Sequence, residues 1–224
     1  MNASFALRYL MLAGALSAGH GAFAGQQVYE PLSASVRSAL HGSVADRASP
    51  RLVFASPREA QNWLSSMSAR LAKRIPDAQT RVEFLTTVQY ESKRAGLDPQ
   101  MVLGLIEVES RFRKYAVSPA GARGYMQVMP FWIDLIGEAD HDLFKLRTNL
   151  RYGCVILRHY LDAERGDIYR ALSRYNGSVG GSNAYAVRVV QSWQSRWLFK
   201  AERRLPSSGR TAGSADRRRH QRDA

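Results

Sequence analysis

The stretch that decides the fold of this chain runs from Glu109 to Pro130 and reads ESRFRKYAVSPAGARGYMQVMP. It begins at the end of an apolar segment, Pro99 to Phe112, whose hydrophobic residues recur at helical spacing. At about 100° per residue, Glu109 lies roughly 20° from Val102 around the helix, whereas Glu107 lies about 140° away. The pattern therefore predicts a helix over Pro99 to Phe112 that carries Glu109 on its apolar face.

A carboxyl group on an apolar face is costly to ionise, so the pKa of Glu109 is expected to rise. A carboxyl group that stays protonated near neutral pH is suited to general acid catalysis. The same position also fits a structural residue, hydrogen-bonded or paired with Arg111 or Arg113. Periodicity alone leaves both interpretations open.

The residues after this helix form a longer pattern. Glu-Ser at the helix end is followed by Ser-x-x-Gly-Ala-x-Gly-x-Met-Gln-x-Met-Pro over residues 118–130. This pattern resembles the signature of the soluble lytic murein transglycosylases, whose catalytic domain is similar to goose-type lysozyme. Two later segments resemble the second and third motifs of that family: Asn149 to Gly153, continuing to Leu161, and Ala171 to Gly177. The resemblance covers about Leu85 to Trp197 and implies an all-α, lysozyme-like helical domain with a glycan-binding groove.

The resemblance also implies roles for individual residues. Glu109 would be the sole catalytic acid and base. Ser118 and Gln127 would lie near the bound sugars, and Met126 would line the groove. The remaining substrate-binding residues, which would face the acid across the cleft, are Tyr175 and Asn176.

Several of these positions have simpler explanations as well. The Gln127 amide could bind a sugar or hydrogen-bond the backbone of its own loop. Met126 could be a core residue, because methionine packs in a core more often than it contacts a ligand. Tyr175 could hydrogen-bond Glu109 or merely close a helix. Gly121 and Gly124 permit backbone conformations that other residues resist, which would let the loop turn back over the end of the Glu109 helix.

The sequence departs from the family pattern at Tyr125, where family members commonly carry Leu. The added ring and hydroxyl could alter a wall of the groove, while the acid itself is unchanged. Other aromatic residues are candidates for the groove walls: Phe131, Trp132, Tyr175, Tyr185 and Trp193.

Ordinary glycosidases use two carboxylates. Four further acids follow the motif in this chain, but none sits in a context that predicts burial beside Glu109: Asp134, Glu138, Asp140 and Asp142. The mechanism implied by the resemblance needs only Glu109. It would protonate the leaving oxygen of the β-1,4 bond between N-acetylmuramic acid and N-acetylglucosamine, then accept a proton from the 6-hydroxyl as a 1,6-anhydro ring closes. The chain is therefore expected to be a lyase that acts on peptidoglycan.

Two other functions stay open. One is a module that binds peptidoglycan, or serves a secretion scaffold, without cutting; such a relative would be expected to lose Glu109 or Gln127, and this chain has both. The other is a hydrolytic muramidase of the goose-type lysozyme kind, which the lack of a second candidate carboxylate disfavours. Neither a cofactor nor a metal is expected, because His141 and His159 are isolated and no nucleotide-binding glycine loop occurs.

The N-terminus predicts export. Residues 1–24 carry a short apolar run and end in Ala22-Phe23-Ala24, which is typical of a signal peptide cleaved after Ala24. The run is far shorter than the roughly 20 residues that span a bilayer, so no stable membrane span is expected after cleavage. A periplasmic or secreted protein follows, and work beside envelope machinery such as a secretion, pilus or conjugation apparatus stays open.

The rest of the chain divides by composition. Residues 25–55 show no sustained period and suggest a linker or loosely attached arm, residues 56–200 form the predicted domain, and residues 201–224 form a basic, disordered tail. Helix starts are predicted at Ser56-Pro57, at Asp77 and at Asp98-Pro99. Further helices are expected over about 150–163, 168–174 and 184–199.

The charge is strongly positive, with 32 Lys and Arg against 19 Asp and Glu in 224 residues, a formal net charge of +13. A cationic surface would concentrate on the stem-peptide carboxylates of peptidoglycan. Nucleic acid is the rival partner for such a charge, but the export signal disfavours it. The single cysteine, Cys154, lies in an apolar run and is expected in the core.

Overall fold

The computed structural model describes residues 27–45 and 48–200 of the chain. In this part it contains helices and no strand, as the all-α prediction required. The elements are α1 (Ala34–Ala45), α2 (Pro57–Leu71), α3 (Ala78–Arg94), α4 (Pro99–Ser110), α5 (Phe131–Ile136), α6 (Leu146–Ala163), α7 (Ile168–Asn176), α8 (Ala184–Ser192) and the short π-helix η1 (Trp193–Trp197). The predicted signal peptide and basic tail lie outside the described residues.

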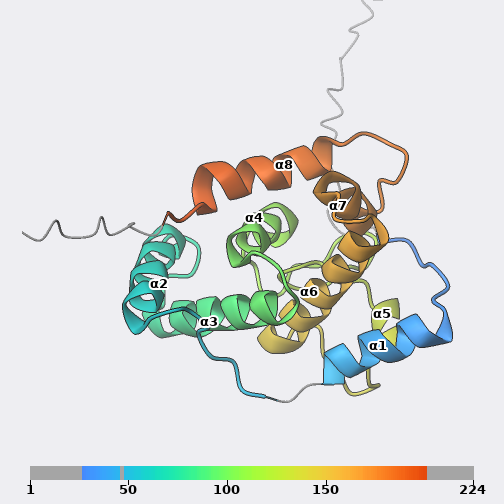
Figure 1. Ribbon diagram of the computed structural model, residues 1–224, viewed down its shortest axis with the longest axis horizontal. Coiled ribbons are helices and arrows are strands. Elements are labelled where there is room, and N and C mark those ends of the chain that lie inside the picture. Colours follow the sequence, from blue (N-terminus) through green and yellow to red (C-terminus); the bar gives the residue numbers. More distant parts are fainter. Residues whose placement is uncertain (1–26, 46–47, 201–224) are drawn as a thin grey trace, which may run out of the picture.

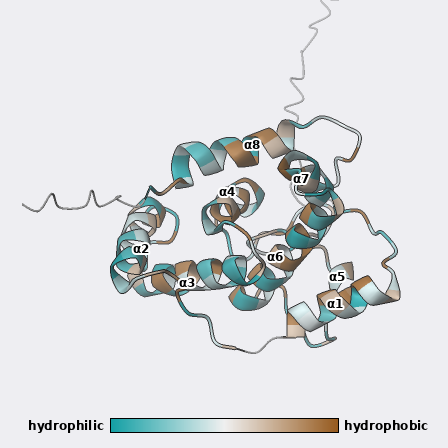
Figure 2. Ribbon diagram, in the orientation of Figure 1, coloured by the Kyte–Doolittle hydropathy of each residue, from teal (hydrophilic) through white to brown (hydrophobic). Residues whose placement is uncertain are grey.

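Helix α4 lies in the middle of the other helices (Figure 1). It packs against α3, α8 and η1, and most of its side chains are buried. Gly104 permits the close approach to η1, because a Cβ atom there would lie 2.8 Å from the backbone nitrogen of Trp193. The surrounding helices carry separate hydrophobic and hydrophilic faces (Figure 2). The apolar faces of α2, α3, α4, α6, α7 and α8 contribute to one core cluster.

The predicted helix starts are confirmed by their caps. Ser56 accepts from the backbone N–H of Glu59 at 3.2 Å. Asp77 accepts from Thr80, and Asp98 from Gln100, each at 2.7 Å. These bonds satisfy backbone donors that a helix cannot satisfy itself.

Some predicted boundaries differ from the structure. The central helix ends at Ser110 and not at Phe112, because Arg111 and Phe112 both take left-handed backbone conformations, with φ of 52° and 64°. The last helix is α-helical only to Ser192 and then widens into η1. Helix α5 was not predicted as an element. Its six residues are too few to show a period.

The N-terminal arm differs most from expectation. Within the predicted linker, residues 25–55, the structure forms α1, which packs against α5 and α6 (Figure 1). Gln27 is buried, and Tyr29 packs edge-on against Phe131 with ring centroids 5.7 Å apart. The described part of this segment is therefore attached to the domain by specific contacts, which the weak amphipathic pattern of α1 did not reveal.

A buried ion cluster joins α1, α3 and α6. Glu91 in α3 is fully buried and accepts from Arg151 at 2.9 Å, Arg94 at 3.0 Å and Arg147 at 3.4 Å. Arg151 also donates to the backbone carbonyl of Val44 at the end of α1. A buried carboxylate requires such partners, because its desolvation would otherwise be prohibitive. Within the described residues, no helix has the length and apolar character needed to cross a bilayer.

Candidate active site

Glu109 lies in the last turn of α4 with only 6% of its surface exposed. This placement confirms the apolar face that the helical period predicted. Its Oε1 accepts a hydrogen bond from the hydroxyl of Tyr185 in α8. Its Oε2 is buried and has no hydrogen-bond partner in the structure. The two oxygens of this carboxyl group are therefore not equivalent, and Oε2 is the one free to exchange a proton with a ligand.

Burial raises the pKa of Glu109 to about 8. The Tyr185 hydrogen bond and the positive charge of Arg188 act in the opposite direction but do not outweigh the loss of hydration. Glu109 is thus mostly protonated at neutral pH. A protonated carboxyl group with one unpartnered oxygen can serve as a general acid, and the groups that favour its ionised form can hold it afterwards as a base.

The loop after α4 is held by short antiparallel pairing. Isolated bridges join Arg123 to Val117 and to Val128. Gly124 takes a φ of 75°, and a Cβ atom there would lie 2.6 Å from the carbonyl oxygen of Leu143. Gly124 is therefore required by both its backbone conformation and its surroundings.

Asn149 supports this loop from α6. Its Oδ1 accepts from the backbone N–H of Met126 at 2.8 Å, and its Nδ2 donates to the carbonyls of Arg123 and Leu143 at 2.8 and 2.9 Å. Gly153, one turn later, leaves room for Met126, because a Cβ atom would overlap the Met126 side chain. The second sequence motif therefore holds the first motif in place.

Met126 itself has no exposed surface. The resemblance implies that it lines the groove, whereas the structure places it beneath the loop against Gly153. The structure therefore agrees with the alternative that Met126 is a core residue. The contact between Met126 in the loop and Gly153 in α6 determines this position. Because the two residues lie in different segments of the chain, local sequence does not predict the contact.

Gln127 combines a strained backbone with a buried amide. Its φ is 50°, in the left-handed region. Its Nε2 donates to the carbonyls of Ala116 and Gly124 at 3.1 and 3.0 Å. Both amide hydrogens therefore satisfy loop backbone, so any sugar contact from this residue would have to use its Oε1.

The hydrogen bond to Glu109 that was considered for Tyr175 is made by Tyr185. The Tyr175 hydroxyl donates to the carbonyl of Met126 at 2.8 Å, so it does not bind Glu109. Burial raises the pKa of Tyr175, and the charge of Glu109 adds to this increase. Tyr185, considered from sequence only as a groove wall, is the residue that binds the acid. Its position outside the three motifs left no signal for that role.

The other expected binding residues lie at turns. The Ser118 hydroxyl is half-buried and accepts from the backbone N–H of Ala122 at 3.1 Å, within the loop that Gly121 turns at a φ of 90°. Asn176 is the last residue of α7 and is also half-buried. It precedes Gly177, which ends the helix in the left-handed conformation.

Tyr125 is part of the hydrophobic core. It is 6% exposed and packs against Phe84 of α3 with ring centroids 4.9 Å apart. Its departure from the common Leu therefore adds aromatic contact to the core. Cys154 is likewise buried, and burial raises the pKa of its thiol to about 12, which confirms it as a core residue.

Gln27 is a residue at the site that sequence reasoning missed. Its Nε2 donates to the carbonyl of Gln127 at 3.2 Å, and its Oε1 accepts from the backbone N–H of Met129 at 3.0 Å. It thus pairs with the loop as a neighbouring strand would. Because 100 residues separate Gln27 from Gln127, only the folded chain reveals the contact.

The other acids near the motif stay at the surface. Asp134, Glu138, Asp140 and Asp142 are exposed, and Asp142 caps the turn at Phe144. None of them shares the buried environment of Glu109. Within the described residues, no group of three or more His, Cys, Asp or Glu side chains gathers as metal ligands would.

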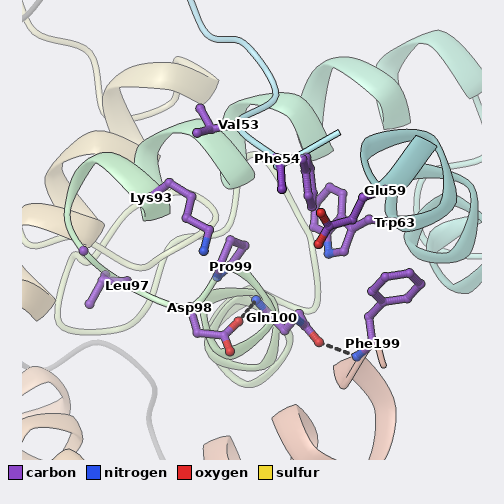
Figure 3. A pocket seen from close by; sticks show the side chains of 12 residues that line it. Val53, Phe54, Glu59, Trp63, Lys93, Leu97, Asp98, Pro99, Gln100 and Phe199 are labelled. Carbon is purple, nitrogen blue, oxygen red and sulfur yellow. Dashed lines mark hydrogen bonds between the residues drawn. The ribbon is translucent and has the colours of Figure 1, made fainter. Parts of the chain in front are cut away.

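A cavity of about 710 Å³ lies at the opposite end of α4 (Figure 3). Phe54, Trp63 and Phe199 form its aromatic side, and the cap pair Asp98 and Gln100 lies at the helix start. Glu109 follows the cap residue Asp98 by eleven residues, which corresponds to roughly 16 Å along an α-helix. This cavity is therefore not the place where Glu109 would meet a ligand.

The described helices surround the buried carboxyl group of Glu109, an arrangement consistent with an all-α, lysozyme-like domain. Residues 86–191 match the family described as Transglycosylase SLT domain. This match includes Glu109, Tyr185 and all three motifs, so the part of the chain that holds the candidate acid is similar to this family.

Named relatives agree with this assignment. The chain is 40% identical over 147 residues to a "Membrane-bound lytic murein transglycosylase C" of Mannheimia succiniciproducens, covering 53% of this chain and 40% of the relative. It is 53% identical over 129 residues to the protein of the same name from Glaesserella parasuis, covering 54% and 35%. A "Transglycosylase" of Enterobacteria phage PRD1 is 30% identical over 102 residues, covering 46% and 37%. The chain spans two fifths or less of the length of these relatives.

Proposed function

We propose that this protein is a lytic transglycosylase of peptidoglycan. It cleaves the β-1,4 bond between N-acetylmuramic acid and N-acetylglucosamine and leaves a 1,6-anhydro-muramoyl end. The single observation that carries the proposal is Glu109, buried with its pKa raised to about 8 and with Oε2 unpartnered. The SLT domain match and the printed names of the relatives support the reaction class.

Glu109 acts first as the acid. Its proton passes from Oε2 to the leaving oxygen of the glycosidic bond, and the substrate's own N-acetyl group stabilises the anomeric carbon. The carboxylate that results accepts a hydrogen bond from Tyr185 and is attracted by Arg188. These two interactions lower the cost of the buried charge at the stage where it forms.

Glu109 then acts as the base. It takes the proton of the 6-hydroxyl while that oxygen bonds to the anomeric carbon, so the 1,6-anhydro ring closes and the acid is regenerated. No water is consumed. A second carboxylate is not needed, and the exposed positions of Asp134 and Glu138 agree with a single acid/base.

Ser118, Gln127 and Asn176 are proposed to lie along the glycan, with Met126 and Tyr175 supporting their loop from within. Ser118 and Asn176 are half-buried, and Gln127 retains its Oε1 for a ligand hydroxyl. The proposed partners are peptidoglycan strands in the periplasm or outside the cell. The signal-like residues 1–24 support that location, and work beside envelope machinery is an extension of the same proposal.

The test is mass spectrometry of products from isolated peptidoglycan, with the wild-type protein and its Glu109→Gln variant in parallel. We expect anhydro-muropeptides from the wild type and none from the variant. Products with reducing ends, heavier by one water, would show a hydrolase. Binding without release of any product would show a glycan-binding module.

A further inference from the structure

A groove of about 790 Å³ lies beside the last turn of α4, between that helix and the α8–η1 segment. Four arginine side chains line it, one after α2, one after α4, one in α8 and one in η1: Arg74, Arg111, Arg188 and Arg196. Gln191, Ser192 and Ser195 add polar groups. We call these residues the arginine groove. Such a lining favours an anionic ligand with hydrogen-bond acceptors.

The charge of the arginine groove is only partly compensated from within. Arg196 donates to Oε1 of Glu107 at 2.6 Å, and Ser192 and Trp197 donate to its Oε2 at 2.7 and 2.9 Å. Burial raises the pKa of Glu107, but these hydrogen bonds outweigh it and leave the pKa below its ordinary value. Glu107 is therefore ionised and neutralises one arginine.

The other three arginines of the groove, Arg74, Arg111 and Arg188, form no ion pair with the described residues. Four guanidinium groups and one carboxylate leave a net charge of +3 in the lining. A concentration of uncompensated charge in a concave site raises the local concentration of anions. The positive charge of the groove therefore favours binding of a ligand with several carboxylates.

The arginine groove and the proposed catalytic residue lie on different sides of α4, and Glu109 is not part of the groove lining. Glu107 precedes Glu109 by two residues, and side chains two apart on a helix point in nearly opposite directions. Arg188 follows Tyr185 by about one turn of α8, and its charge acts on Glu109. The same two helices thus present the acid and the cationic lining.

We propose that the arginine groove binds the carboxylates of the peptide stems carried by N-acetylmuramic acid. This inference rests on the proposed function, since the stem is attached to the sugar whose bond Glu109 would cleave. A stem carries several carboxylates close to that bond. Planar guanidinium groups bind carboxylates through paired, charge-assisted hydrogen bonds. The groove therefore selects strands that retain peptides over bare glycan.

The experiment compares binding to strands that carry peptides with binding to strands stripped of peptides by an amidase. The full chain with Glu109→Gln prevents turnover during the measurement. Into it we introduce Arg74→Gln together with Arg111→Gln. A matched control is Arg37→Gln together with Arg58→Gln, which removes the same charge from exposed sites in α1 and α2 outside the groove.

We expect the groove variant to bind peptide-bearing strands about five-fold more weakly than its parent, in line with exposed ion pairs. Binding to stripped strands should change no more than in the control variant. An equal loss on both kinds of strand, or equal behaviour of the groove and control variants, would overturn the inference. Circular dichroism and thermal unfolding verify that both variants remain folded.

The two proposals fail in different ways. Suppose that the wild-type protein releases no anhydro product, but the groove variant loses peptide-dependent binding. The proposed reaction is then wrong, while the proposed stem-binding site stands. If the wild type releases anhydro products equally well from both kinds of strand, and the groove variant binds both normally, the reaction stands and the stem site is wrong.

Discussion

The Tyr185 hydroxyl donates its hydrogen bond to Oε1 of Glu109, across 76 residues of sequence and from a separate helix. This contact leaves Oε2 as the unpartnered oxygen of the acid. It also lowers a pKa that burial would otherwise raise still further. Tyr185 is therefore a positioning residue for Glu109, and its removal should affect both the rate and its pH dependence.

Tyr185→Phe removes the hydroxyl and keeps the ring. We expect product formation to fall about ten-fold or more, because a hydrogen bond to a charged group contributes roughly 1.5 to 3 kcal/mol. The alkaline limb of the rate profile should move to higher pH, since the interaction that lowers the Glu109 pKa is lost. Release of soluble muropeptides across a pH series measures both effects. An unchanged profile would contradict the assignment.

Tyr175→Phe is the matched control for this experiment. It leaves the carbonyl of Met126 without its donor, so we expect a loss of about 1 to 3 kcal/mol in the free energy of unfolding. The alkaline limb should stay in place, because Tyr175 does not hydrogen-bond Glu109. Urea unfolding and the same rate profile separate the two tyrosines.

Stability should fall with rising pH because of Glu109. Its pKa is raised from 4.5 to about 8 in the folded protein, so the folded state holds a proton that the unfolded chain releases between these values. The stabilisation is complete below the lower value and is lost as pH rises through the upper one, with a slope of up to about 1.4 kcal/mol per pH unit. Above about pH 8 this contribution should level off.

Urea unfolding of the wild type and Glu109→Gln at several pH values tests this linkage. The variant cannot ionise at this position, so its stability relative to the wild type should increase toward alkaline pH. A difference that stays constant from acid to alkaline conditions would show that Glu109 titrates normally.

Gly153→Ala should destabilise the fold by about 1 to 3 kcal/mol, the usual cost of overpacking. The new methyl group would overlap Met126, and the Met126 Cβ lies only 2.7 Å from its position. Gly42→Ala in α1 is the control, since nothing lies within 4 Å of its added methyl group. That change should instead stabilise by up to about 1 kcal/mol, as helix propensity predicts. Thermal unfolding of the two variants gives the comparison.

Glu91→Gln should destabilise by about 3 to 5 kcal/mol, because it leaves buried guanidinium charge without its carboxylate. Asp162→Asn removes a carboxylate from the exposed pair with Arg158 and should cost less than about 1 kcal/mol. Chemical unfolding measures both. Similar effects from the two substitutions would mean that the Glu91 cluster is more hydrated than its burial implies.

Local sequence determined the helical class, the helix starts and the burial of Glu109. Ser56, Asp77 and Asp98 cap helices through contacts within three residues, and Glu109 follows from the helical period. The motifs also indicated the loop, because Gly124 needs a backbone conformation that glycine adopts readily. These features depend on neighbours in the chain, so a single sequence contains the information.

Only the tertiary structure decided which residues meet. It assigned Tyr185 and not Tyr175 to Glu109, placed Met126 beneath its loop, and brought Gln27 to the backbone at Gln127. Each of these contacts joins segments far apart in the chain, and packing of the helices sets their distance. Periodicity can place a residue on a face of its own helix, but the partner it meets there depends on how all the helices pack together.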